Sequence, residues 1–308
     1  MISRRNIRVK VMQELYAQSS GESVEKNNPV ANLLKQLEQT KHLFVYLLYF
    51  ISEIARYAET DAKIRASKNL PTEHDRNVNT KIAGNQLLWQ ILENESFKKA
   101  ISAGKVELPD TREQVKKIYN ELVVSEEYKK YIHRDGRDKK NEKDILLFIF
   151  TDLMLPNENF ITHIEENFIN WDDDAEMMNQ LIQGFLQKPA SHNLNQLIGE
   201  EKLKFAKELL LTTQNKSDYA LELIKPKLKN WDSERIASLD MILMQMGVCE
   251  FLFFETIPPK VTINEYIDIA KEYSTQQSGQ FVNGILDSIH KDLLAQNKIH
   301  KIDFKQKA

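Results

Sequence analysis

The sequence predicts an all-α protein, and three observations lead to that fold class. Apolar residues recur at helical spacing along almost the whole chain. The alternation typical of strands is missing, as are glycine-rich hairpin turns. Only 9 of the 308 residues are glycine, well below the average usage of about 7%.

Composition describes an ordinary globular chain, with 42% hydrophobic and 28% charged residues. The net charge of −3 gives no general attraction to nucleic acid, so any such site must be a local patch. A single cysteine, Cys249, excludes an intramolecular disulfide framework and fits a reducing cytoplasm. The N-terminus lacks the apolar segment of a signal peptide, and the longest apolar run, 43–51, is far shorter than the roughly 20 residues that span a bilayer. We therefore expect a cytoplasmic protein without a membrane partner.

Helical periodicity first appears over residues 3–19 and, after a polar linker, over a long segment at about 32–67. The polar stretch 69–79 is ambiguous. A helix follows around Leu87–Leu92, and another begins after Asp110, which is placed as its N-cap. The charged run 133–144 is predicted to be a solvated, mobile loop. Further helices are expected to begin near residues 143, 159, 173, 201, 217, 233, 263 and 276.

Residues 257–289 predict two helices joined by a short turn. Thr262 with Glu265, and Ser274 with Gln277, have the spacing of capping boxes. Gly284 inside the second helix costs about 1 kcal/mol relative to alanine. We therefore expect a neighbouring helix in close contact at Gly284.

One internal similarity leaves two interpretations open. Residues 170–172 and 230–232 both have the sequence Asn-Trp-Asp, and apolar positions around them match in the same register. Chance matching of two helical hairpins would produce this pattern, and so would two packed bundles of related design.

No catalytic or metal-binding set can be assembled from the sequence. The seven histidines are scattered, and no glycine-rich loop is available to hold phosphate. The acidic run Asp172–Asp174 is interpreted as the N-terminus of a helix, where negative charge is favoured. Cys249 lies among apolar residues and is expected to be a core side chain. We therefore predict a protein that is not an enzyme and that has no cofactor and no metal.

The first predicted helix carries a local basic cluster. Arg4, Arg5 and Arg8 precede Tyr16, and helical geometry places Arg5, Arg8 and Tyr16 together beside the apolar stripe. Arginines next to an exposed aromatic ring suit single-stranded RNA, because guanidinium groups bind phosphates and the ring stacks on a base. A solvated charged face is the alternative interpretation.

Two stretches of the chain resemble the NusB family of bacterial transcription antitermination factors. One is the first helix, with the sequence RRNIRVKVMQELYA. The other runs from about Phe205 to Leu293 and includes AKELLL, then LIKPKLKNWDSERIASLDMILMQMGVCEFLFF, then IPPKVTINEYIDIAKEYS and SGQFVNGILD. The resemblance implies two packed helical bundles. It also implies binding of boxA-like RNA together with the ribosomal protein NusE, within the RNA polymerase antitermination complex that transcribes ribosomal RNA operons.

The resemblance also implies which residues make contact. RNA contacts would fall on Arg4, Arg5, Arg8, Tyr16, Ser278, Gln280 and Phe281. The surface facing NusE would include the helix of Glu250 and residues near Phe254. The position of Phe281 on an apolar stripe favours burial, whereas the resemblance favours contact with a base, and the sequence leaves both open.

The chain departs from the family pattern at several points. Asn6 stands where a further arginine is common, and Gln276 and Gln277 replace acidic residues. The largest departure is a helical insertion, which gives a predicted division into an arginine-rich helix (1–19), an insertion or extended N-terminal bundle (20–203), a NusB-like bundle (204–296) and a basic tail (297–308). Two other functions stay open: an all-helical interaction scaffold without RNA, and a NusB-like domain related to ribosomal RNA cytosine methyltransferases.

Overall fold

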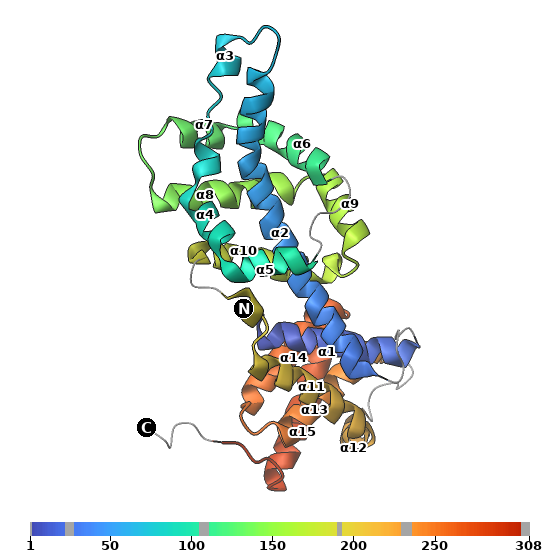
Figure 1. Ribbon diagram of the computed structural model, residues 1–308. Coiled ribbons are helices and arrows are strands. Elements are labelled where there is room, and N and C mark those ends of the chain that lie inside the picture. The colour runs from blue at the N-terminus through green and yellow to red at the C-terminus, as the bar shows by residue number, and fades with distance from the viewer. Residues whose placement is uncertain (1, 22–27, 105–110, 190–192, 229–235, 303–308) are drawn as a thin grey trace. The chain divides into compact units, whose positions relative to one another are not determined.

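The computed structural model describes residues 2–21, 28–104, 111–189, 193–228 and 236–302. Within these ranges every regular element is a helix and none is a strand, which confirms the predicted all-α fold class. The helices pack into two compact units, each with its own core (Figure 1). We call Glu38–Ile198 the insert unit, and Ile2–Leu37 with Gly199–Ala308 the terminal unit. The four-part division of the chain stays a prediction beside these bounds.

The terminal unit is built around α13, which packs against all of its other long helices. α13 is apolar on all sides, as expected for a helix at the centre of a core. The elements of this unit are α1 (Arg4–Ser20), the beginning of α2 (Pro29–Ala66), α11 (Glu200–Asn215), α12 (Ser217–Ile224), η5 (Lys225–Leu228), α13 (Ser238–Phe253), α14 (Pro259–Tyr273) and α15 (Ser278–Ala295).

The insert unit is built around the rest of α2, whose side chains from Phe44 to Ile54 supply much of its core. A buried aromatic cluster joins α2 to α9: Tyr46 Oη lies 2.7 Å from His163 Nε2, and the Phe50 and Phe160 ring centres are 4.8 Å apart. The remaining elements are α3 (Glu73–Arg76), η1 (Lys81–Gly84), α4 (Gln86–Glu93), α5 (Glu95–Gly104), α6 (Thr111–Val124), α7 (Glu126–His133), α8 (Lys139–Phe148), the π-helix η2 (Ile149–Met154), α9 (Glu158–Asn167), α10 (Trp171–Gln187) and η4 (Leu194–Gln196).

Most predicted helix positions agree with the structure. The segments 3–19 and 32–67 correspond to α1 and α2, and the starts near 201 and 217 correspond to Glu200 and Ser217. The acidic run forms the first turn of α10, as predicted, although Asn170 occupies the N-cap position. Asp110, the start near 233 and the second Asn-Trp-Asp motif lie outside the described residues, so the internal repeat stays open.

Both predicted capping boxes near the C-terminus were wrong. α14 begins at Pro259, because proline at the first helical position has a preset φ and needs no N–H partner. Thr262 therefore lies inside α14, where its hydroxyl donates to a buried carboxylate. Ser274 ends α14, and α15 begins at Ser278 after Gln277, which makes no side-chain cap.

The close helix contact expected at Gly284 was also wrong. Gly284 is exposed, and a Cβ atom there would meet nothing within 4 Å. Close packing occurs at two other glycines. A Cβ on Gly247 would lie 2.9 Å from Leu286, and one on Gly279 would lie 2.7 Å from Lys271 Cγ.

The predicted loop 133–144 is shorter than expected. Residues 133–140 are exposed, as predicted, but α8 already begins at Lys139 and Glu142 is buried.

Within the described ranges no single helix is both long and apolar enough to cross a membrane, and only the bent pair Lys139–Met154 with Glu158–Asn167 has the required length and composition together.

Candidate nucleic-acid interface

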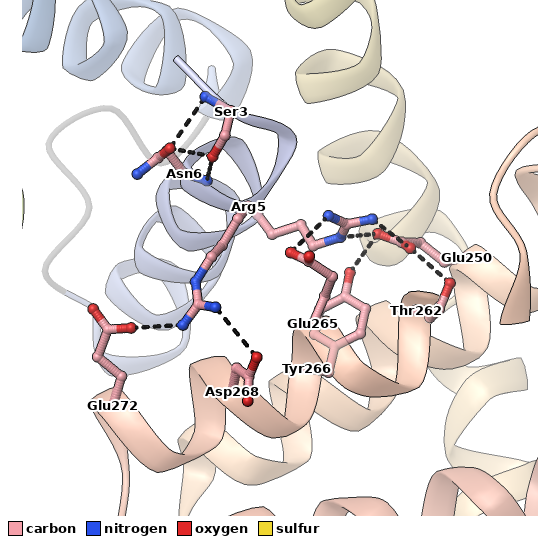
Figure 2. A network of polar contacts seen from close by, with 10 residues as sticks. Ser3, Arg5, Asn6, Glu250, Thr262, Glu265, Tyr266, Asp268 and Glu272 are labelled. Carbon is pink, nitrogen blue, oxygen red and sulfur yellow. Dashed lines mark hydrogen bonds and ion pairs between the residues drawn. The ribbon is translucent and has the colours of Figure 1, made fainter. Parts of the chain in front are cut away.

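The basic helix α1 begins with a capping box formed by Ser3 and Asn6. Ser3 Oγ accepts a hydrogen bond from the Asn6 backbone N–H at 3.1 Å, and Asn6 Oδ1 accepts one from the Ser3 backbone N–H at 3.1 Å (Figure 2). This reciprocal pair satisfies two N–H groups that the helix leaves free and fixes where α1 starts. Asn6 therefore has a structural role at the position where the family often has an arginine.

Arg5 extends from α1 to α14 (Figure 2). Its Nη2 lies 2.9 Å from Glu272 Oε2, and its Nη1 lies 3.3 Å from Asp268 Oδ2. All three side chains are more than a third exposed. Exposed ion pairs stabilise a fold by only about 0–1 kcal/mol, so a phosphate group can replace these carboxylates at little cost.

Arg4 and Tyr16 are also accessible on α1. Arg4 pairs with the exposed carboxylate of Glu201, and its guanidinium carbon lies 5.6 Å from the centre of the Phe205 ring. Tyr16 is 42% exposed. Eleven residues separate Arg5 from Tyr16, which puts both on the same side of α1, about 16 Å apart along its axis.

Arg8, in contrast, lies inside the terminal unit, with 2% of its side chain exposed. Its Nε and Nη2 donate to the two oxygens of Glu250 at 2.6 and 3.1 Å, and its Nη1 lies 3.2 Å from Glu265 Oε2. Glu250 is fully buried and also accepts hydrogen bonds from Thr262 Oγ1 at 2.9 Å and Tyr266 Oη at 2.8 Å (Figure 2). This network joins α1, α13 and α14.

The charge state of this network is fixed by its geometry. Burial lowers the pKa of the Arg8 guanidinium, but the charge and hydrogen bonds of Glu250 outweigh burial and raise it above its usual value. Burial, reinforced by the nearby Glu250 charge, raises the pKa of Tyr266 well above its usual range. Arg8 is therefore always charged and Tyr266 always neutral, and the hydrogen-bonding groups of Arg8 are directed into the protein rather than toward a ligand.

The turn before α15 contains both buried and exposed members of the predicted RNA site. Ser278 is buried, and its Oγ donates to Asp240 Oδ2 at 2.7 Å and receives the Thr275 backbone N–H at 3.2 Å. Phe281 is 8% exposed, so its ring belongs to the core. Gln280 is exposed. Ser278 and Phe281 thus position the turn, and Gln280 is the residue of the three that a ligand can reach.

Lys271 links the arginine side of the unit to this turn. It is 61% exposed and lies in α14 between the two carboxylates that hold Arg5. Its aliphatic chain covers Gly279, since a Cβ there would lie 2.7 Å from Lys271 Cγ. The neighbouring exposed side chains are neutral amides: Gln276, Gln277, Gln280 and Asn283. Sequence reasoning missed Lys271, because only the packing of α14 on α15 brings it beside this turn.

The predicted partner-binding residues are not at the surface. Glu250 is fully buried in the Arg8 network, and Phe254 packs edge-on against Phe205 with ring centres 5.7 Å apart. Phe253, one residue earlier, is 43% exposed, and the Lys216 ammonium lies 5.7 Å from its ring centre. Phe253 is therefore the aromatic side chain that a partner can reach in this region.

The single cysteine of the chain, Cys249, lies in the core. Burial raises the pKa of the Cys249 thiol to about 12, so it is protonated at neutral pH. Among the residues that the structure describes, no three histidine, cysteine or carboxylate side chains lie together as metal ligands.

Comparison with known proteins gives a consistent set of relatives. The family model described as "NusB family" matches residues 166–291. The chain is 44% identical over 97 residues to the transcription antitermination protein NusB of Salinibacter ruber, which is 32% of this chain and 61% of that protein. It is 42% identical over 96 residues to the transcription antitermination protein NusB of Finegoldia magna, and the aligned segment is 31% of this chain and 70% of that protein. It is 51% identical over 71 residues to the NusB protein of Methylacidiphilum infernorum, and that segment is 23% of this chain and 50% of that protein. No solved structure matches the chain.

Proposed function

Because the chain belongs to the NusB family, we propose that its terminal unit binds a boxA-like single-stranded RNA together with the ribosomal protein NusE. In this role it supports transcription antitermination by RNA polymerase in ribosomal RNA operons and carries out no reaction of its own. The aligned segments span between half and seven-tenths of the three relatives named above, so the proposal concerns the terminal unit.

One observation carries the proposal. The two stretches that resemble the family, the first helix and residues 205–293, are far apart in the sequence but pack into one unit. Arg5 lies directly against α14, and α14 packs on α15. A strand of RNA that contacts Arg5, Lys271 and Gln280 would therefore meet cations for its phosphates and amides for its bases.

The contacts differ in kind. Arg4, Arg5 and Lys271 would bind phosphates, Tyr16 would stack on a base, and Gln280 would hydrogen-bond to a base edge or a phosphate. Arg8, Ser278 and Phe281 would hold these elements in place without touching RNA. Phe253 would serve as an aromatic anchor for NusE, a role in which exposed aromatic side chains are common.

The test is a titration of the full-length protein into labelled boxA-like RNA, with and without NusE, at 50 and 200 mM salt. Arg5→Ala should weaken binding and reduce the salt slope by at most about 0.7, the value for one phosphate contact on a single strand, because Arg5 gives up its carboxylate partners when it binds phosphate. Tyr16→Ala should weaken binding about 5- to 150-fold, equivalent to the 1–3 kcal/mol of a stacked base. Arg56→Ala is the matched control, because Arg56 lies in the insert unit and is about half exposed and paired with a carboxylate. Absence of RNA binding at 50 mM salt, alone and with NusE, would refute the proposal.

One observation favours a second function, an interaction scaffold without RNA. Arg4, Arg5 and Arg8 all have carboxylate partners inside the terminal unit, which is also what a purely structural cluster would show. A double Arg5→Ala, Tyr16→Ala variant that binds RNA as well as the unchanged protein, while Phe253→Ala loses NusE, would favour the scaffold.

A further inference from the structure

The insert unit carries its own local excess of positive charge at the junction of α7 and α8. Residues 129–143 include seven lysines and arginines and three carboxylates, whereas the whole chain has 42 and 45. α7 and α8 pack against each other and are joined by residues 134–138 (Figure 1). The seven cations lie in the two helices and in this turn. Gly136 has a φ of 73°, a left-handed conformation that glycine adopts without strain, and it allows the turn to be tight.

Four of these cations are available to a ligand. Lys130, Arg134, Lys139 and Lys140 are exposed, and none forms an ion pair with a described residue. The guanidinium of Arg134 donates to the neutral Asn141 Oδ1. These cations thus differ from Arg4 and Arg5 of the terminal unit, which are paired with carboxylates.

A hollow of about 240 Å³ lies beside these cations. Its apolar lining comes from Tyr131, Ile145 and Phe148, and Lys130 and Arg134 also line it. The volume is below the roughly 300–1,000 Å³ of ligand pockets, so it suits a single ring rather than a large ligand. The hollow is also lined by three polar side chains that can accept hydrogen bonds: Glu127, Asn141 and Asp144.

A buried carboxylate holds this surface in shape. Glu142, 1% exposed, accepts hydrogen bonds from Tyr131 Oη at 2.9 Å, from Arg137 Nη1 at 3.1 Å and from the Gln86 backbone N–H at 2.5 Å. Lys81 donates to the carbonyl oxygens of Tyr131 and Arg134 at the end of α7. The turn is therefore anchored on both sides, so a ligand would meet preorganised cations.

We propose that this α7–α8 surface, defined by Lys130, Arg134, Lys139, Lys140 and the adjacent hollow, binds single-stranded RNA. Phosphates contact the four cations, and one base occupies the hollow, where carboxylates at its edge accept hydrogen bonds from an exocyclic amino group, as they do from cytosine N4. The four cations lie beside an apolar hollow, and this combination favours RNA over an acidic protein segment. Carboxylates of an acidic segment would contact the cations but leave the hollow empty, whereas RNA supplies both phosphates and a ring.

Another hollow of the insert unit shows the contrast. It measures about 350 Å³ and is lined by three carboxylates, those of Glu165, Glu166 and Asp174, and by no lysine or arginine, whereas the hollow beside α7 and α8 is lined by two carboxylates and two cations. Because like charges repel, that hollow does not suit a polyanion.

The experiment uses the full-length protein carrying R4A/R5A/Y16A/K271A, which removes the proposed phosphate and stacking contacts of the terminal unit, so that its outcome depends on the insert unit. A labelled, unstructured 12-nucleotide RNA rich in cytidine is titrated at 50 and 200 mM salt. The test variant is K130Q/R134Q/K139Q/K140Q. The control is K98Q/K99Q/K116Q/K117Q, which removes the same charge from four exposed lysines of the same unit. Four phosphate contacts at about −0.7 each predict a roughly 50-fold loss of affinity between the two salt concentrations, and the test variant should lose that dependence.

A second readout locates the contact. RNA containing 4-thiouridine should crosslink to the peptide 126–148 and should not do so in the test variant. Equal weakening of the test and control variants, unchanged affinity of the test variant, or crosslinks outside 126–148 would each overturn the proposal. Complete displacement of the RNA by poly-glutamate at equal charge concentration would assign the surface to an acidic protein instead. Thermal unfolding of both variants confirms that they remain folded.

Discussion

Arg8 offers the sharpest test of the difference between a structural and an RNA-binding arginine. Its guanidinium is 2% exposed and donates to both oxygens of Glu250, which is fully buried. Arg8→Ala would leave the Glu250 carboxylate inside α13 without its cation. We expect this variant to lose stability first, and to lose RNA binding only as a consequence.

The structure sets the size of the effect. Removing one partner of a buried ion pair costs about 3–5 kcal/mol, because a charge stays buried without compensation. Two features place Arg8 in that range: Glu250 has no access to solvent, and the remaining hydrogen bonds to Thr262 and Tyr266 do not neutralise its charge. Arg5→Ala, at a pair that is more than a third exposed, should cost less than about 1 kcal/mol.

The assay is unfolding in urea, monitored by hydrogen exchange of the backbone amides of α1 and α13. These amides report on the terminal unit alone, which is needed because the two units need not unfold in one step. A double variant, Arg8→Met with Glu250→Gln, removes both charges; the amide oxygen accepts from one of the two hydroxyls of Thr262 and Tyr266, and the amide NH2 donates to the other. It should recover most of the lost stability, as expected when both members of a buried pair are replaced. A loss below about 1 kcal/mol for Arg8→Ala, or no recovery in the double variant, would show that the network does not hold α1 in place.

Three further predictions follow from individual contacts. Ser278→Ala should lower the free energy of unfolding by about 1–3 kcal/mol in urea, because Asp240 loses a buried donor; a change below this range would mean that the turn is held by other contacts. Gly247→Ala should destabilise by about 1–3 kcal/mol, because its Cβ would lie only 2.9 Å from the methyl carbons of Leu286 in α15, whereas Gly284→Ala should be neutral or stabilise by up to about 1 kcal/mol; equal effects would contradict the packing. Burial lowers the pKa of Lys301 to about 8, so above pH 8 the folded protein releases a proton that the unfolded chain keeps until about pH 10.5; the stability of the protein relative to Lys301→Met should rise with pH across that window, a comparison that cancels the opposite effect of the raised pKa values of Cys249 and Tyr266, and an NMR midpoint near 10.5 would contradict the lowered pKa.

The helices could be predicted from the sequence because their signal is local. Apolar spacing gave the positions of α1 and α2 within three residues at each end. The capping boxes at Thr262 and Ser274 failed although their spacing was correct. Pro259 starts α14 three residues before Thr262, so Thr262 is not at the helix start. Ser274 has the spacing of an N-cap for α15 but instead ends α14. Such choices depend on which start buries more apolar surface, which the local pattern does not contain.

The burial of charged residues could not be predicted for a different reason. Arg5 and Arg8 lie on the same side of α1, and their sequence surroundings are alike. What separates them is Glu250, a residue 242 positions away that is itself buried and needs a cation. Lys10 shows the same limit, since it is 2% exposed on a helix whose pattern suggested a solvated basic face.

The two cationic surfaces differ in what RNA would have to displace. At the terminal unit, Arg4 and Arg5 already contact carboxylates, so each phosphate exchanges one anion for another and gains only the difference between two ion pairs. Affinity there must come largely from uncharged contacts, such as stacking on Tyr16 and hydrogen bonds to Gln280. At the α7–α8 surface Lys130, Arg134, Lys139 and Lys140 form no ion pair with a described residue, so binding would release counterions directly. The terminal unit should therefore discriminate between RNA sequences with a shallow salt slope, and the insert unit should bind many sequences with a steep one.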